Sequence, residues 1–442
     1  MLRDKNTIIS RRSYINELLF IIGITLILLY STKVRVFGNP DEGAHYLRAY
    51  EVAHGHLFNT KDNIGTPINC TDYITIAKKY APIAYYQDLA EKGGEACHVN
   101  SINSAGTYPP TAYLFLATAI VVGDTYGLTI EENVIFARFF NGFFCILLIY
   151  VSICYVSLAK YSMYGILFSP MLMLILSAIS ADGVTIALSF AFFALLTQAI
   201  NSDKTNNNIF YLLLLVSALI GSTKIIYCLL CFSYMVVFIN KFGLRINKNN
   251  YKEFLKSTIP GLTAAGVSIL SLIFTDRSMV YLGNGAQPLA QVDFILHNPI
   301  AFMKIIFGTI TNTNILYQIF TPIHLVQSQS YILVTIFIVM LISWGGLLFI
   351  EALILKPLSK VFILIILIVS IIITILPLYM TYTPPGYSSV LGVQGRYFIP
   401  TLLIFTFLVP LFPVLKYNSF LKMRKFLILI ILMTNFLVIY QA

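Results

Sequence analysis

Long apolar runs recur along most of the chain and are separated by shorter polar segments. Runs of about 18 or more apolar residues are typical of helices that cross the hydrocarbon layer of a membrane, which is ~30 Å thick. The first run follows Arg11 and Arg12, is too long for a signal peptide and has no cleavage site after it. We therefore expect eleven membrane-spanning helices, at residues 17–37, 133–158, 162–180, 183–200, 208–222, 224–240, 257–275, 331–351, 361–379, 397–415 and 425–441.

One apolar stretch, at residues 108–123, does not fit this pattern. It opens with Pro109-Pro110, and its apolar part is short for a crossing. Such a length suits an interfacial or re-entrant helix. Whether it crosses decides which side of the membrane every later loop occupies.

The distribution of charge favours a stretch that does not cross. Of the 442 residues 58% are hydrophobic and only 11% are charged, which excludes a soluble enzyme. The net charge of +10 suggests nucleic acid at first, but in membrane proteins Lys and Arg gather on the cytoplasmic side. We assume a cytoplasmic N-terminus and no crossing at 108–123. The cytoplasmic segments then carry 17 Lys and Arg and 5 Asp and Glu, whereas the external segments carry 12 Lys and Arg and 14 Asp and Glu. We expect a multi-pass protein of the bacterial cytoplasmic membrane, with an external C-terminus and no nucleic-acid partner.

Three long segments then face the outside of a single transmembrane domain that occupies residues 1–442. They are a large first loop with juxtamembrane helices at 38–132, a second loop at 276–330 and a third at 380–396. The first loop holds eleven of the fourteen external acids. We expect the active site to lie on this external face.

The sharpest local pattern is NPDEGAHYLR at residues 39–48, directly after the first span. One interpretation is purely structural, with Asn39 as the N-cap, Pro40 at the first helical position and two acids at the positive end of the helix dipole. The other is functional, because helical spacing places Asp41, His45 and Arg48 on one stripe. A carboxylate at a membrane boundary is a plausible general base, since partial desolvation raises its pKa.

Four further charged residues lie at the external ends of predicted spans. Asp182 is either a turn residue before Gly183 or an acid retained for function, because acids at that depth are costly. Arg138, Lys224 and Arg396 either extend their charged ends to the interface or bind an anion such as a lipid phosphate. Arg396 has the best context, because neighbouring glycines allow the backbone to approach a ligand.

Cys70 and Cys97 are the only cysteines in the predicted external loops. An oxidising periplasm makes a disulfide between them the default expectation. Metal binding by Cys70, Cys97 and His98 lacks the paired spacing of a zinc site. We expect no metal and no cofactor, although a divalent ion is not excluded by the sequence.

Several of these motifs together resemble a known family. They are Pro40-Asp41-Glu42, Tyr108-Pro109-Pro110, Arg138, the Ser-Ala-Asp that ends at Asp182, Lys224 and, most specifically, GVQGRYFIP at 392–400. The chain resembles, over nearly its whole length, the bacterial membrane family called domain of unknown function 2142. That family is similar to the GT-C glycosyltransferases, which take a sugar from a polyprenyl-phosphate carrier.

The resemblance implies an all-α, GT-C-like fold and a function for each motif. Asp41 would be the catalytic base, with Glu42 as the fallback, and the cations would hold the donor phosphate. The residues implied in substrate binding are His45, Arg48, Tyr108, Arg138, Asp182, Lys224, Gln394, Arg396 and Tyr397. The enzyme would be an inverting hexosyltransferase that moves a sugar, such as glucose, to a surface polysaccharide or lipid-linked acceptor such as O-antigen.

Two other functions share the same compartment and carrier. A flippase or transporter for a lipid-linked oligosaccharide would place charged residues at mid-span depth and show internal symmetry. A polysaccharide polymerase would transfer a whole repeat unit instead of one sugar. The sequence favours the transferase over the flippase, because the unusual charges gather at one face, but it does not separate the transferase from a polymerase.

Overall fold

The fold is given by a computed structural model. It describes residues 5–58, 67–69, 96–98, 105–156, 158–202, 207–274, 282–283, 285–322, 325, 330–351, 355–408 and 417–441.

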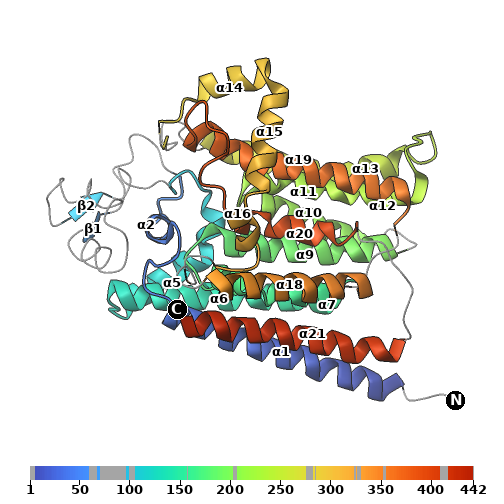
Figure 1. The fold of residues 1–442 in the computed structure, drawn as a ribbon, viewed down its shortest axis with the longest axis horizontal. Helices are drawn as coiled ribbons and strands as arrows, with labels where there is room; N and C mark the ends of the chain where they lie inside the picture. Colours follow the sequence, from blue (N-terminus) through green and yellow to red (C-terminus); the bar gives the residue numbers. More distant parts are fainter. Residues whose placement is uncertain are drawn as a thin grey trace.

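The described residues are almost entirely helical (Figure 1). A three-residue strand at Pro67–Asn69 pairs in antiparallel fashion with another at Ala96–His98, and Ile68 lies opposite Cys97. The elements run in the following order: α1 (Lys5–Lys33), α2 (Glu42–Ala53), β1 (Pro67–Asn69), β2 (Ala96–His98), η3 (Pro110–Tyr113), α5 (Leu114–Thr125), α6 (Ile130–Tyr155), α7 (Lys160–Leu167), α8 (Pro170–Leu176), α9 (Ala181–Asn201), α10 (Asn207–Gly221), η4 (Ile225–Tyr227), α11 (Cys228–Cys231), η5 (Phe232–Tyr234), α12 (Met235–Phe242), α13 (Tyr251–Phe274), α14 (Pro288–His297), α15 (Pro299–Ile310), α16 (Thr313–Gln318), α18 (Ser330–Glu351), α19 (Pro357–Tyr382), η7 (Gly395–Phe398), α20 (Ile399–Phe405) and α21 (Tyr417–Gln441).

Eight helices in the described part of the chain are long and apolar enough to cross a membrane, or nine if the bent pair α14–α15 is one span. The expected count of eleven is therefore not confirmed. The eight correspond to eight of the predicted spans. The other three predicted spans, at 162–180, 208–222 and 397–415, contain only short or broken helices among the described residues.

The predicted span at 162–180 is broken by Ser169 and Pro170. The first half ends at Leu167, and Ser169 caps the second, because its hydroxyl accepts a hydrogen bond from the Leu172 backbone N–H at 3.4 Å. Pro170 occupies the first position of α8, where its missing N–H costs nothing. Every residue of α8 is buried. Helices that are buried on all sides read as apolar runs in sequence, although they are too short to span a bilayer.

Helices α10 and α13 lie closely together at Gly221. A Cβ at this position would collide with the backbone of Ala264, so only glycine permits the approach. The Ser268 hydroxyl donates to the Gly221 carbonyl oxygen across the same contact at 3.0 Å. Helix α10 has 15 residues and is one of the shorter apolar helices, as is the pair η3–α5 at 110–125. The expectation of a short helix at 108–123 is thus confirmed.

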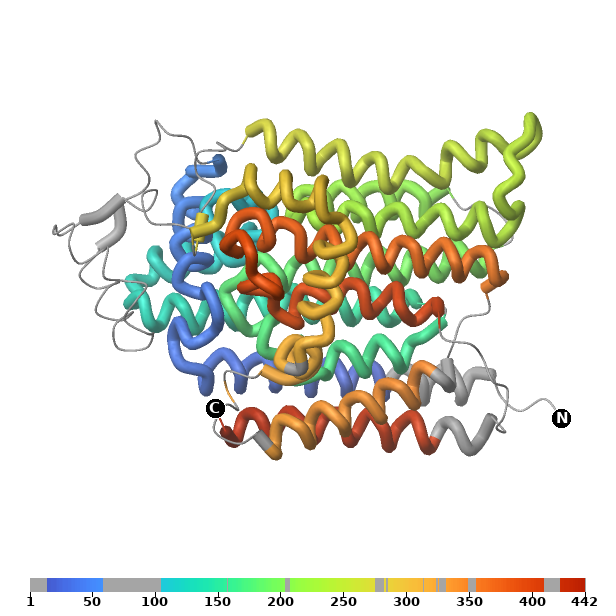
Figure 2. The backbone as a smooth tube through the Cα atoms, turned by 45° about the horizontal axis from the view of Figure 1, so that its top comes forward, coloured from blue at the N-terminus to red at the C-terminus, as the bar shows by residue number. Residues whose placement is uncertain are grey.

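The long helices run roughly along one common direction (Figures 1 and 2). Helices α1 and α21 lie side by side and run the same way, so their C-terminal ends share one end of the bundle. The start of α2 lies at that end, which we call the site end. An apolar cluster there, which includes Tyr46, Leu116 and Val134, packs α2 against α5 and α6.

A second apolar cluster fixes the segment before α20. It joins Phe302 and Ile306 of α15 to Ile375 and Tyr379 of α19, and also includes Phe398 of η7. Helices α14 and α15 meet at an angle of 112°. This packing holds the GVQGRY segment against the bundle.

Candidate functional site

The start of α2 differs from the expected helix cap. The helix begins at Glu42, and its N-cap residue is Asp41, which has a left-handed backbone (φ 62°) and makes no capping hydrogen bond with its side chain. The structural interpretation of this motif, with Asn39 as the N-cap and Pro40 at the first helical position, is therefore wrong. A left-handed conformation is unfavourable for a residue with a Cβ, and such strain is concentrated at functional sites. The Asp41 carboxylate is left free to reach another part of the chain.

Four charged side chains meet at the site end. An Asp41 carboxylate oxygen lies 3.2 Å from a terminal nitrogen of Arg396, and Arg396 Nε lies 3.2 Å from an oxygen of Asp182. The other Asp182 oxygen accepts a hydrogen bond from Lys224 Nζ at 2.5 Å. The result is a chain of alternating charge, Asp41–Arg396–Asp182–Lys224, which we call the acid–cation cluster. Its formal charge is zero.

Solvent reaches only one end of this cluster. The side chain of Asp41 is 54% exposed, whereas those of Asp182, Lys224 and Arg396 are between 3% and 6% exposed. Buried charges are costly unless they are paired, and here each buried charge has an opposite partner. Asp41 is therefore the member of the cluster that an incoming molecule can contact.

Local sequence explains how three of these residues are presented. Asp182 lies in the first turn of α9, where the Ser180 hydroxyl accepts from the Asp182 N–H at 3.1 Å and the helix dipole favours an acid. Asp182 is not the loose turn residue of the alternative interpretation. Lys224 directly precedes η4, and Arg396 lies in η7. A Cβ at Gly395 would collide with the backbone of Gln318, so this glycine allows η7 to lie close to the end of α16.

Aromatic rings enclose the cations. Lys224 Nζ lies 5.1 Å from the ring centroids of both Tyr108 and Tyr397, and the Arg396 guanidinium lies 5.4 Å from the Tyr397 ring. Rings at these distances attract cations through their negative faces. The Tyr227 hydroxyl donates a hydrogen bond to the Tyr397 carbonyl oxygen at 2.9 Å, which holds the backbone of Tyr397 in place beside the cations.

His45 forms the side of the site next to α2. Its Nδ1 lies 2.6 Å from the Tyr113 hydroxyl, and its ring lies 5.5 Å from that of Tyr108. The pKa of His45 is lowered to about 4, mainly by burial and also by Arg396 and Lys224, whereas Asp41 and Asp182 act in the opposite direction. The imidazole is therefore neutral at pH 7. Sequence reasoning missed Tyr113 and Tyr227, although Tyr113 follows the Tyr-Pro-Pro motif closely.

Three predicted site residues are paired elsewhere. Arg138 donates to both carboxylate oxygens of Glu42, at 2.7 and 2.5 Å, and neither side chain is exposed. Arg48 donates to Glu51 at 3.0 Å and to the Tyr108 carbonyl oxygen at 3.1 Å. The expected stripe of Asp41, His45 and Arg48 does not converge on one group, because Arg48 pairs with Glu51 and not with Asp41 or Asp182.

Gln394 contacts a residue of the site through its backbone. Its carbonyl oxygen accepts a hydrogen bond from the Tyr397 N–H at 3.1 Å. The structure thus brings Asp41, His45, Tyr108, Asp182, Lys224, Arg396 and Tyr397 together, and it places Glu42, Arg48 and Arg138 in buried internal pairs.

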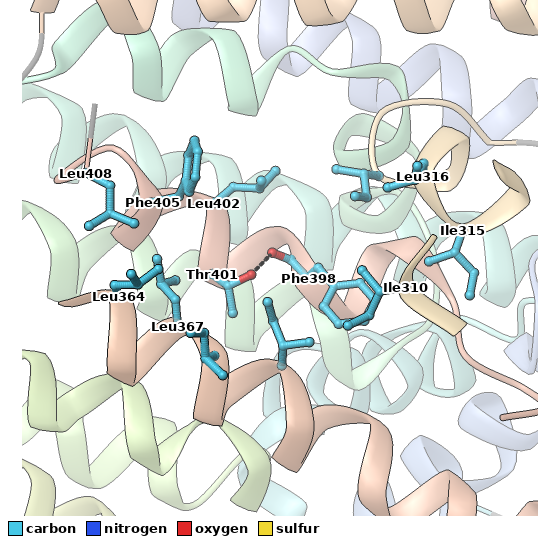
Figure 3. A pocket seen from close by; sticks show the side chains of 13 residues that line it. Ile310, Ile315, Leu316, Leu364, Leu367, Phe398, Thr401, Leu402, Phe405 and Leu408 are labelled. Atoms are coloured by element: carbon cyan, nitrogen blue, oxygen red, sulfur yellow. Dashed lines mark hydrogen bonds between the residues drawn. The ribbon is translucent and has the colours of Figure 1, made fainter. Parts of the chain in front are cut away.

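An apolar pocket of about 250 Å³ lies beside the GVQGRY segment (Figure 3). Phe398, two residues after Arg396, contributes to its wall. Thr401 is its one residue with a polar side chain, and this hydroxyl donates to the Phe398 carbonyl oxygen. The lining residues are Ile310, Ile315, Leu316, Ile319, Leu364, Leu367, Ile368, Ile371, Phe398, Thr401, Leu402, Phe405 and Leu408.

The pocket opens on the outer surface of the helical bundle. Its lining residues Leu364, Ile368 and Phe405 are each at least 40% exposed. In a membrane protein, large apolar side chains on the outer surface face lipid. One wall of the pocket, η7, also carries Arg396 of the acid–cation cluster.

Comparison with protein families assigns the chain to a family. A family described as "Predicted membrane protein (DUF2142)" matches residues 20–405, which is most of the chain. The chain belongs to this family. No match was found among curated proteins or among solved structures. Membership of DUF2142 and the apolar helices establish a multi-pass membrane protein associated with the lipid bilayer.

Two expectations for this DUF2142 protein concern cysteines and metal. Cys70 and the side chain of Cys97 lie outside the described residues, so the disulfide stays a prediction. Among the described residues, no group of three His, Cys, Asp or Glu side chains is arranged to hold a metal ion. The four cysteines whose side chains are described, Cys145, Cys154, Cys228 and Cys231, are free.

Proposed function

We propose that this protein is a membrane glycosyltransferase that moves a sugar from a polyprenyl-phosphate carrier to a surface polysaccharide or lipid-linked acceptor. The observation that carries the proposal is the position of the acid–cation cluster, with one exposed carboxylate, beside an apolar pocket open to lipid. The donor has an apolar chain, an anionic phosphate and a sugar. The pocket matches the apolar chain, and Arg396 matches the phosphate.

The cluster suits a donor with a single phosphate. Lys224 is buried, pairs with Asp182 and lies against two tyrosine rings, at the end of the cluster away from the exposed Asp41. Arg396 is the cation that can change partner, because its contact with Asp41 lies at the solvent-exposed end. One guanidinium can hold one phosphate group through charge-assisted hydrogen bonds. A diphosphate would bring a further negative charge that the cluster does not offset.

In the proposed reaction, the donor phosphate takes Arg396 away from Asp41, and the carboxylate becomes available as a base. The acceptor hydroxyl oxygen attacks the anomeric carbon of the sugar while Asp41 accepts the hydroxyl proton. The bond between this carbon and the phosphate oxygen breaks, and the polyprenyl phosphate leaves with the bonding electrons. Arg396 stabilises the charge that develops on the leaving phosphate. A single displacement inverts the anomeric configuration.

The proposed orientation follows the distribution of charge. The basic loops lie on the cytoplasmic side, and the site end lies on the external side of the bacterial cytoplasmic membrane. Nucleotide-linked sugars are absent from that compartment, which accords with a lipid-linked donor. The acceptor would then be a surface glycan such as O-antigen.

The test is the Asp41→Asn variant with radiolabelled polyprenyl-phosphate glucose as donor. Membranes of the source organism that lack this chain supply the acceptor, and the purified protein is added to them. Loss of a general base lowers turnover by about 10²- to 10⁴-fold. Asp293→Asn, the same change at an exposed acid of α14, should retain full turnover. The abundance of both variants in the membrane should equal that of the wild type.

Full turnover by Asp41→Asn would overturn the assignment of the base. Wild-type protein that transfers none of a panel of polyprenyl-phosphate hexoses would overturn the donor class. The mass of the product separates a transferase, which adds one sugar, from a polymerase, which adds a repeat unit.

A further inference from the structure

The buried pair Glu42–Arg138 connects three parts of the chain that surround the acid–cation cluster. The Arg138 guanidinium, from α6, donates to the carbonyl oxygens of Val34 and Arg35, each at 2.7 Å, at the end of α1. The same guanidinium binds both oxygens of Glu42, the first residue of α2. The end of α1 and the start of α2 are thus joined through one side chain.

Glu42 extends the connection to α9. Its Oε1 atom also accepts a hydrogen bond from the Ile179 backbone N–H at 3.0 Å, and its Oε2 atom accepts from the Asn39 N–H at 3.3 Å. Ile179 lies three residues before Asp182, and Asn39 lies two residues before Asp41. One carboxylate therefore contacts the backbone beside each of the two acids of the cluster.

The geometry points to Glu42 and Arg138 as positioning residues for both acids. We propose that the pair holds Asp41 in its left-handed conformation and holds Asp182 at the distance at which Arg396 bridges the two carboxylates. Glu42 is then neither the base nor a substitute for it, and Arg138 does not bind the donor. All the contacts of both side chains described above are with the protein itself, and neither side chain is exposed.

Several alternatives for the pair make different predictions. A buried salt bridge is weak evidence for stability, because the desolvation of both charges offsets their attraction. If the pair served only folding, replacing Glu42 and Arg138 by apolar residues of similar volume would leave the reactivity of position 41 unchanged. A catalytic Glu42 would lose its function equally with Gln or Ala, whereas a positioning residue should be partly rescued by Gln, which keeps an acceptor oxygen.

The first experiment measures the surroundings of position 41 without any transfer reaction. In the Asp41→Cys variant, the new thiol lies near Arg396, so an anionic methanethiosulfonate should label it several-fold faster than a cationic one. The label is located by peptide mass. Asp293→Cys, at an exposed position of α14, serves as the control with no such preference.

The double change Glu42→Met and Arg138→Met is then added to Asp41→Cys. It removes both charges together, so that no unpaired charge remains buried. We expect the preference for the anionic reagent to fall to the control value. An unchanged preference in a double variant of normal abundance would overturn the proposal.

The second experiment is kinetic and rests on the proposed function. Turnover should fall in the order wild type, Glu42→Gln, Glu42→Ala, with a smaller change in the KM for the lipid donor, because Arg396, the cation proposed to bind the donor phosphate, is retained. Equal losses for Gln and Ala would overturn the positioning assignment. If the wild type shows no transfer, the proposed function fails, and the labelling experiment still decides the positioning role.

Discussion

Asp41 and His45 lie one helical turn apart, yet their environments differ sharply. Asp41 is 54% exposed, whereas His45 is buried and bonded to Tyr113. Burial of an imidazole disfavours its charged form, because a protonated ring loses its hydration. At the residue scale, therefore, the exposed acid is the group suited to proton transfer, and His45 is suited to a neutral, positioning contact.

The lowered pKa of His45 predicts a pH dependence of stability. Its folded-state value of about 4 lies below the ordinary value of 6.5, so the unfolded state binds the proton more tightly. This contribution is fully present above pH 6.5 and is lost as the pH falls toward 4, up to about 3 kcal/mol. Thermal unfolding of the purified protein in detergent should show this decline. His45→Gln should make it shallower, and an equally steep decline in that variant would contradict the prediction.

At the scale of the elements, the predicted span at 162–180 shows why an apolar run need not be a crossing. An apolar run reports burial, but it does not report whether lipid or protein provides the apolar surroundings. Helices α7 and α8 are packed inside the bundle, where a break at Ser169-Pro170 is satisfied by a side-chain cap. Helix α20 is similarly short, and its outer side forms part of the lipid-facing pocket.

The pocket predicts a difference between two neighbouring positions of α19. Ile368 lines the pocket and is 47% exposed, whereas Ile365, on the same helix, is 53% exposed and does not line it. Ile368→Trp should raise the KM for a long-chain donor by about tenfold, because about two buried methylene groups lose their contacts. Ile365→Trp should leave the KM unchanged.

A donor with a chain too short to reach the pocket gives a second control. The KM for this short-chain donor should be the same in the wild type and in the Ile368→Trp variant. A parallel rise for both donors would show that the change acts on the acid–cation cluster and not on binding of the lipid chain.

At the scale of the whole molecule, the parallel course of α1 and α21 relates the two ends of the described chain. Because these neighbouring helices run in the same direction, the start of α1 and the end of α21 lie at opposite ends of the bundle (Figure 1). Opposite ends are also what the distribution of basic loops predicts for the two termini, with the N-terminus expected inside and the C-terminus outside.

A reporter protein fused after Ala442 should therefore read as external. The same reporter inserted in the basic loop at 241–256 should read as cytoplasmic and serves as the control. If the reporter after Ala442 reads as cytoplasmic and the reporter in the 241–256 loop reads as external, the orientation of the later helices must be reversed, and the proposed external site would be contradicted.

The sequence by itself determined the class of the protein and the four charged residues of the acid–cation cluster. Apolar runs and sparse charge indicate a helical membrane protein, because the hydrophobic effect acts on composition and local periodicity. Four site residues were recognisable because charged residues at the ends of apolar runs are costly unless they are paired or functional. They are Asp41, Asp182, Lys224 and Arg396. The short helix at 108–123 followed from its length.

Only the tertiary structure decided which charges face one another. Arg396 pairs with Asp41, 355 residues away in the chain, whereas Arg138 pairs with Glu42, 96 residues away. In sequence, Asp41 and Glu42 are adjacent acids and Arg138 and Arg396 are similar cations at span ends. The left-handed backbone at Asp41 turns the two carboxylates to different partners. Sequence patterns report local preference, but the choice of partner for a buried charge depends on which helices pack together, and that is a property of the folded bundle.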